Sequence, residues 1–134
     1  MEETAEEEVV GVIYKRVEIA GDKGRKRVAA LFDTGASASF VKRAVVDKIA
    51  TIVRIPVPWT FRLGDGKARL RTDRAVYVVL RFDKATFYHT LVVADDLAEE
   101  LILGADFMQR WKVKLDPERE EIVIDRRALR HLLI

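Results

Sequence analysis

Short stretches of valine, isoleucine, leucine and aromatic residues follow one another along the chain, separated by glycine, aspartate and proline. Segments of this length with turn residues at intervals of about 8–12 residues are typical of strands in an all-β domain. The pattern predicts strands at 9–19, 25–32, 75–82, 86–94 and 101–104, a strand–turn–strand unit at 60–71, and a final hairpin at 112–125.

Three segments break this pattern. Apolar residues at near-helical spacing predict a helix within 39–50, and the sequences at 95–100 and 105–111 predict a helical turn and a helix. The two prolines of 55–59 fix an extended, non-helical link. The chain is therefore expected to form a mainly β closed barrel or sandwich with one or two short helices, while 126–134 is compatible with either helix or strand.

The length and composition indicate one ordinary domain. The chain has 134 residues, 49% of them hydrophobic, which is enough for a real core. We expect an acidic disordered tail at 1–8 and a single domain at 9–134. The N-terminus does not resemble a signal peptide, and no apolar run is long enough to span a membrane, so a cytoplasmic protein without membrane partners is expected.

Residue usage excludes several kinds of chemistry. Cysteine is absent, which excludes disulfides, thiol catalysis and cysteine-bound metals. His89 and His131 lie far apart in the sequence and are expected to be surface or strand histidines, so no metal or other cofactor is predicted. Asparagine is also absent while Glu, Lys and Arg are abundant, a composition typical of thermophilic proteins.

The small formal charge of +2 conceals an asymmetry. Residues 1–8 hold five Glu, which leaves the remaining chain with 24 basic and 17 acidic residues, a formal charge of +7. A basic body could contact nucleic acid. However, the densest basic run, 23–27, falls in a predicted turn and is better explained as a solvated hairpin.

Asp33 ends an apolar run and is followed by Thr34, Gly35 and Ala36. An ionised carboxylate at the end of a buried strand must be paired or hydrogen-bonded, because burying it otherwise is unfavourable. Thr34 offers a hydroxyl for a fixed hydrogen-bond network, and Gly35 allows another backbone to approach closely. These three residues suit an oriented, crowded carboxylate, although the same tripeptide also occurs in ordinary turns.

Three segments in a fixed order resemble the retropepsin-like aspartic proteases, the single-domain branch of retroviral type. "ALFDTGASASFV" is similar to that family's active-site loop, "FRLGDGKARL" to its flap hairpin, and "LILGADFM" to its second apolar element with a following helix. The resemblance spans roughly 9–126 and implies a closed acid-protease barrel that works as a C2 homodimer on peptides or unfolded proteins.

The resemblance also implies roles for individual residues. Asp33 would be the catalytic aspartate, Thr34 would bond to the partner's loop, and Gly35 and Ala36 would complete the active-site loop. The flap that binds substrate would contain Leu63, Gly64, Asp65 and Gly66, and the loop would be supported from below by Leu103 and Gly104.

The chemistry of peptide hydrolysis agrees with a dimer. Two carboxylates that share one proton can act as base and acid, as in the aspartic proteases that serve as the standard example of such a pair. This chain has a single Asp-Thr-Gly, so one chain supplies half a site. A two-fold axis would bring Asp33 and its symmetry mate together.

The sequence departs from the retroviral pattern at Ser37 and Ala105, where retroviral enzymes usually have an Asp and an Arg. Both members of an ion pair are missing together, which indicates a closer similarity to cellular and prokaryotic members. Val57, Leu63 and Leu70 are candidate apolar pocket residues. Two other functions remain open: a non-catalytic dimeric module that binds peptides, and a basic β-barrel that binds nucleic acid through Phe82, Phe87 and Tyr88.

Overall fold

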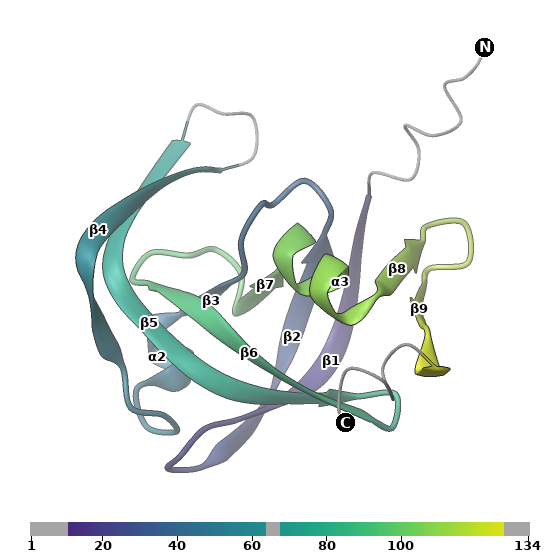
Figure 1. Cartoon of the computed structure of the whole chain (residues 1–134), viewed down its shortest axis with the longest axis horizontal. Helices are drawn as coiled ribbons and strands as arrows, with labels where there is room; N and C mark the ends of the chain where they lie inside the picture. The colour runs from purple at the N-terminus through teal and green to yellow at the C-terminus, as the bar shows by residue number, and fades with distance from the viewer. Residues whose placement is uncertain (1–10, 64–67, 128–134) are drawn as a thin grey trace.

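The computed structural model describes residues 11–63 and 68–127. Within these residues the chain forms nine strands and two short helices (Figure 1). The strands are β1 (Val12–Ala20), β2 (Arg25–Asp33), β3 (Phe40–Lys42), β4 (Val53–Leu63), β5 (Ala68–Phe82), β6 (Ala85–Ala94), β7 (Leu101–Leu103), β8 (Val113–Asp116) and β9 (Glu121–Ile124), and the helices are α2 (Arg43–Val46) and α3 (Ala105–Trp111).

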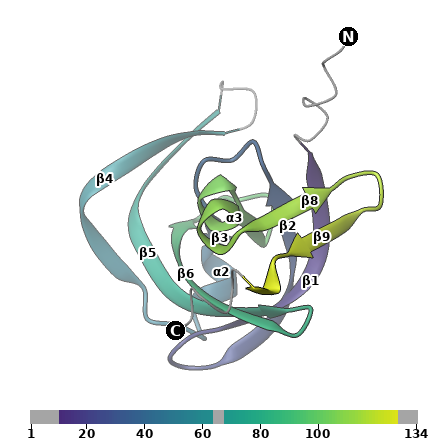
Figure 2. The same ribbon diagram turned by 45° about the vertical axis from the view of Figure 1, so that its right-hand side comes forward.

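Seven strands form one sheet in the order β1-β2-β7-β3-β6-β5-β4. An additional pairing of β1 with β5, through Glu18–Ala20 and Val79–Arg81, joins the sheet to itself. Six strands thereby close into a barrel, and β4 is attached to the outside of β5 (Figures 1 and 2). The predicted mainly β closed barrel with one or two short helices is confirmed.

The barrel is filled by alternating apolar side chains of the strands and by one face of α3. Phe32, Phe87, Phe107 and Trp111 are fully buried, and the rings of Phe87 and Phe107 meet edge to face at 5.2 Å. Contacts of this kind stabilise a core beyond the burial of apolar area alone. The core therefore fixes α3 against the ends of the strands that carry the candidate site.

The predicted helix over 39–50 is wrong in its first part. Phe40–Lys42 form β3, which pairs with both β6 and β7, and only Arg43–Val46 are helical. Phe40 and Val41 are buried in the sheet, so pairing with neighbouring strands outweighs the local helical pattern. The segment 95–100 is likewise a turn and bend rather than a helical turn.

Other expectations are confirmed. Residues 55–59 are extended and lie within β4, where the β4–β5 register shifts between Arg54 and Trp59. Proline lacks a backbone N–H, which explains why this irregular stretch lies on an edge strand. The helix at 105–111 and the final hairpin also form, as α3 and as β8–β9. The proposed tail 1–8, the flap tip 64–66 and residues 128–134 lie outside the described residues.

Candidate active site

Asp33 is the last residue of β2, at the point where the chain leaves the sheet. The preceding Phe32 is fully buried, and Asp33 itself is half-buried. The Gly35 N–H donates to Asp33 Oδ1 at 2.8 Å, and the Ala36 N–H donates to the Asp33 carbonyl at 3.2 Å. Among the described residues, Asp33 has no ion-pair partner and Oδ2 accepts no hydrogen bond, so one carboxylate oxygen is oriented and the other is available.

Thr34 holds the loop to the start of β1. Its Oγ1 accepts a 3.0 Å hydrogen bond from the Gly11 N–H, and the Thr34 N–H donates to the Gly11 carbonyl at 3.3 Å. Within one chain the hydroxyl therefore already has a fixed partner. A bond across to a second chain stays a prediction.

Leu103 and Gly104, which the resemblance assigns to support of the loop, lie at the end of β7 and directly after it. Leu103 is fully buried, and it lies opposite Phe32 in the parallel pairing of β7 with β2. A Cβ added to Gly104 would lie 2.3 Å from the Ala38 carbonyl oxygen and 2.5 Å from that of Ala36. Only glycine allows the loop to approach β7 this closely.

Ser37 and Ala105, the two departures from the retroviral pattern, lie on neighbouring segments. The Ala105 N–H donates to the Ala36 carbonyl at 2.7 Å. A backbone hydrogen bond therefore joins the loop to α3 at the place where an Asp–Arg pair was expected from the retroviral pattern. Ser37 itself is exposed.

A polar network beneath the loop was missed by the sequence reasoning. Buried Ser39 accepts a hydrogen bond from the Gly104 N–H at 3.0 Å and donates to Asp106 Oδ1 at 2.7 Å. Asp106 Oδ2 lies 3.0 Å from His89 Nε2. The three side chains come from three separate elements, and the only sequence signal was Asp106 at a helix start, which favours the helix dipole.

Burial by itself raises the pKa of Asp106. Hydrogen bonds from His89 and Ser39, together with the electrostatic effect of His89, outweigh burial, so the pKa of Asp106 is lowered. The carboxylate therefore stays ionised and keeps accepting hydrogen bonds from both partners. His89 is a strand histidine, as predicted, and its ring also packs edge to face against Phe107 at 5.3 Å.

A cavity of about 380 Å³ opens above Asp33. Its charged lining is Arg62, Asp96 and Glu99 in addition to Asp33, and its apolar lining is Phe40, Leu97, Ala98 and Ile102 together with Ala36. Arg62 lies near the end of β4, so the strand that leads to the predicted flap contributes to this lining. Val57 and Leu70, which were predicted to line the pocket, do not line this cavity, and the side chain of Leu63 lies outside the described residues.

Two of the three aromatic residues considered for the nucleic-acid alternative, Phe82 and Phe87, lie in the core, and Tyr88 is half-buried. Phe82 and Phe87 are buried and stack on one another at 4.9 Å, so neither presents its ring to solvent. Across residues 11–63 and 68–127, no group of three or more His, Asp or Glu side chains is placed to hold a metal ion. In the same part of the chain, no helix is long and apolar enough to cross a membrane.

The closed barrel and the Asp-Thr-Gly loop at the end of β2 define the class of retropepsin-like aspartic proteases. The chain belongs to the family of gag-polyprotein putative aspartyl proteases, whose family model matches residues 17–110. No curated protein matches the sequence significantly.

Two solved structures show the same fold. The retroviral protease-like domain of Ddi1 from Leishmania major has a TM-score of 0.62 and 19% identity, over 87% of this chain and 90% of that domain. The EIAV protease, solved with the inhibitor HBY-793, has a TM-score of 0.54 and 22% identity, over 77% of this chain and 90% of that one. Both are similar in fold to this chain.

Proposed function

We propose that the protein is an aspartic endopeptidase that hydrolyses peptide bonds with a water molecule activated between the Asp33 carboxylates of two chains. One observation carries the proposal: Asp33 ends a buried strand, is oriented by the Gly35 N–H, and faces a cavity without an ion-pair partner among the described residues. A carboxylate kept for structure alone would be expected to pair with a cation.

The mechanism needs both carboxylates. One, ionised, takes a proton from the water as it attacks the peptide carbonyl, while the other, protonated, donates a hydrogen bond to that carbonyl and later supplies a proton for the leaving amine. Two carboxylates close together share one proton because both cannot ionise. The apparent pKa values then belong to the pair, and a homodimer supplies the second carboxylate by symmetry.

The loop supports this role because it is fixed on both sides. Thr34 is hydrogen-bonded to Gly11, and the Ala36 carbonyl accepts a hydrogen bond from the Ala105 N–H. The carboxylate is thereby held in place before substrate binds. A catalytic group that is already fixed in position loses less freedom in the reaction, which speeds catalysis. The cavity has room for one side chain of an extended peptide, beside Phe40, Leu97 and Ile102.

The first test is cleavage of an unfolded protein substrate between acidic and neutral pH by the native protein and by Asp33→Asn. The native protein is expected to cleave and the variant to be inactive while keeping the same melting temperature and mass. Cleavage that persists in the variant would exclude Asp33 as the catalytic group. Binding of the substrate without cleavage by the native protein would instead support a non-catalytic peptide-binding module.

The second test asks whether one site uses two chains. Native protein is mixed with an equal amount of Asp33→Asn and allowed to exchange subunits. If mixed dimers are inactive, the activity per native chain falls to about half, because random pairing places half of the native chains in mixed dimers. Unchanged activity, or a strict monomer by light scattering under assay conditions, would contradict the shared pair.

A further inference from the structure

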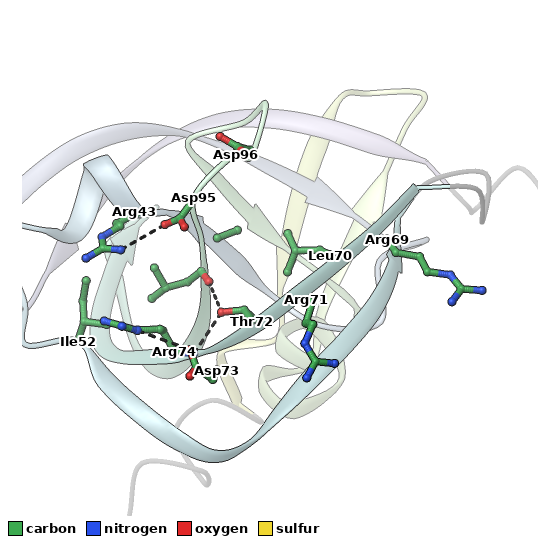
Figure 3. Close-up of a pocket in the computed structure, with 12 residues that line it drawn as sticks. Arg43, Ile52, Arg69, Leu70, Arg71, Thr72, Asp73, Arg74, Asp95 and Asp96 are labelled. Carbon is green, nitrogen blue, oxygen red and sulfur yellow. Dashed lines mark hydrogen bonds and ion pairs between the residues drawn. The ribbon is translucent and has the colours of Figure 1, made fainter.

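A second, larger groove runs beside the first part of β5 and has a volume of about 500 Å³. Arg69, Arg71 and Arg74 lie along β5, with the side chains of Arg69 and Arg71 pointing outward and that of Arg74 running toward Ile52 (Figure 3). Arg43 and Asp95 complete the charged lining and pair with each other (Figure 3). No aromatic side chain is among the residues that line it. The groove is distinct from the cavity above Asp33, but Asp96 lines both.

The strands beside this groove carry a concentrated positive charge. Residues 53–63 and 68–74 contain five Arg and one acidic residue, Asp73. The β4–β5 pairing places Arg62 opposite Arg69 and Arg54 opposite Arg74. Like charges directly opposite each other destabilise a strand pair. Asp73 bridges Arg54 and Arg74, whereas no acid among the described residues bridges Arg62 and Arg69.

Two of the arginines that line the groove remain available to a ligand. Asp73 pairs with both Arg54 and Arg74 at 3.5 Å, and Asp95 pairs with Arg43 at 3.4 Å. These two acids are therefore already neutralised, whereas Asp96, the third acidic residue of the lining, has no ion-pair partner among the described residues. Arg69 and Arg71 are exposed and also have no ion-pair partner among the residues that the structure describes.

The groove also follows an unpaired strand edge. The pairing of β5 with β6 begins at Ala75, whereas β4 pairs with β5 as far as Ala68. Where the strands separate, the Arg74 N–H bonds to Thr72 Oγ1, which donates to the Val93 carbonyl. Residues 69–72 therefore have a strand on one side only, and an extended peptide can add to such an edge through backbone hydrogen bonds.

We propose that this groove is an exosite for an acidic segment of the polypeptide substrate, on one side of the peptide bond that is cut. The proposal rests on the proposed protease function. Because Asp96 lines both the groove and the cavity, a peptide held at Asp33 would pass this residue on its way to Arg69 and Arg71. The free strand edge favours a peptide over a single-stranded nucleic acid, and so does the lack of aromatic side chains on which bases could stack.

The experiment measures binding separately from cleavage by using the full chain with Asp33→Asn. Two fluorescent peptides share the same apolar segment, which is followed by a run of Glu in one and a run of Gln in the other, and fluorescence anisotropy reports their affinities. We expect the Glu peptide to bind about fivefold more tightly at low salt, because two exposed charge pairs form, and the difference to shrink as salt is added.

Charge-matched variants locate the effect. Replacing both Arg69 and Arg71 by Gln is expected to abolish the preference for the Glu peptide. The control replaces Lys26 and Arg27 by Gln, which removes the same charge from exposed positions of β2 outside the groove, and is expected to keep the preference. Equal affinity for the two peptides, or an equal loss in both variants, would overturn the proposal.

The remaining outcomes are also informative. Tighter binding of a single-stranded oligonucleotide than of the Glu peptide, lost in the Arg69/Arg71 variant, would overturn the peptide assignment in favour of nucleic acid. If the Glu preference is present but the native protein cuts neither peptide nor unfolded protein, the exosite stands and the protease proposal fails. If the native protein cuts both peptides with the same kcat/KM and binds them equally, the protease stands and the exosite fails.

Discussion

The contact between Gly104 and the active-site loop gives a sharp prediction for the variant Gly104→Ala. The added Cβ would lie 2.3 Å from the Ala38 carbonyl oxygen, about 1 Å short of the 3.4 Å at which ordinary van der Waals contact begins. The Ala36 carbonyl oxygen is almost as close, at 2.5 Å. Because both neighbours are backbone atoms of the loop, neither can rotate away, and the loop itself must move.

Overpacking of this kind costs about 1–3 kcal/mol. For a chain of this length, a loss of about 2 kcal/mol lowers Tm by about 7 °C. The displaced loop carries Asp33, so kcat/KM is expected to fall even at temperatures where the variant is fully folded, because a shift of about 1 Å in a catalytic group lowers the rate strongly. Tm is measured by calorimetry at one protein concentration, since a dimer's stability depends on concentration.

Gly24→Ala is the matched control. The nearest atom to its added Cβ is Ile49 Cγ2 at 3.5 Å, an ordinary contact. Its Tm is expected to be unchanged or slightly raised, because alanine reduces the freedom of the unfolded chain. If Gly104→Ala melts at the same temperature as Gly24→Ala and keeps full activity, the close approach of loop and β7 does not position the site.

Three further predictions concern the polar contacts around the loop. Ser39→Ala leaves the buried Gly104 N–H without its partner and should lower the free energy of unfolding by about 1–3 kcal/mol, measured by urea denaturation; no change would mean that another acceptor takes its place. Burial raises the pKa of Asp106, but the hydrogen bonds from His89 and Ser39 outweigh this effect, and the pKa is lowered on folding. The ionised carboxylate therefore stabilises the folded protein at pH values above the ordinary pKa of 3.8, and this stabilisation is lost as the pH falls below 3.8. The stability difference between native protein and Asp106→Asn should therefore shrink from about pH 6 to about pH 3, and a constant difference would contradict the assignment. Thr34→Val removes the bond to Gly11 and should cost about 1 kcal/mol by the same urea assay, with Thr60→Val, at an exposed position of β4, as a control that should stay near native stability.

The sequence by itself determined the class of fold and the position of the candidate catalytic residue. Alternating apolar residues and turn signals follow from the pleat of a strand, which repeats every two residues, and they are readable locally. The Asp-Thr-Gly loop, α3 and the final hairpin can likewise be recognised from short stretches of sequence. The composition likewise indicated a chain without cysteine chemistry before any contact was known.

Only the tertiary structure decided how distant segments meet. Phe40–Lys42 became β3 because β6 and β7 flank them. Ser39, Asp106 and His89 form one network although they lie on separate elements of the sequence. Arg69, Arg71 and Arg74 of β5 share one groove with Arg43 and Asp95, which come from distant parts of the sequence. Local patterns report which face of an element is buried, whereas partners of a polar side chain are set by packing between elements, which no local pattern records.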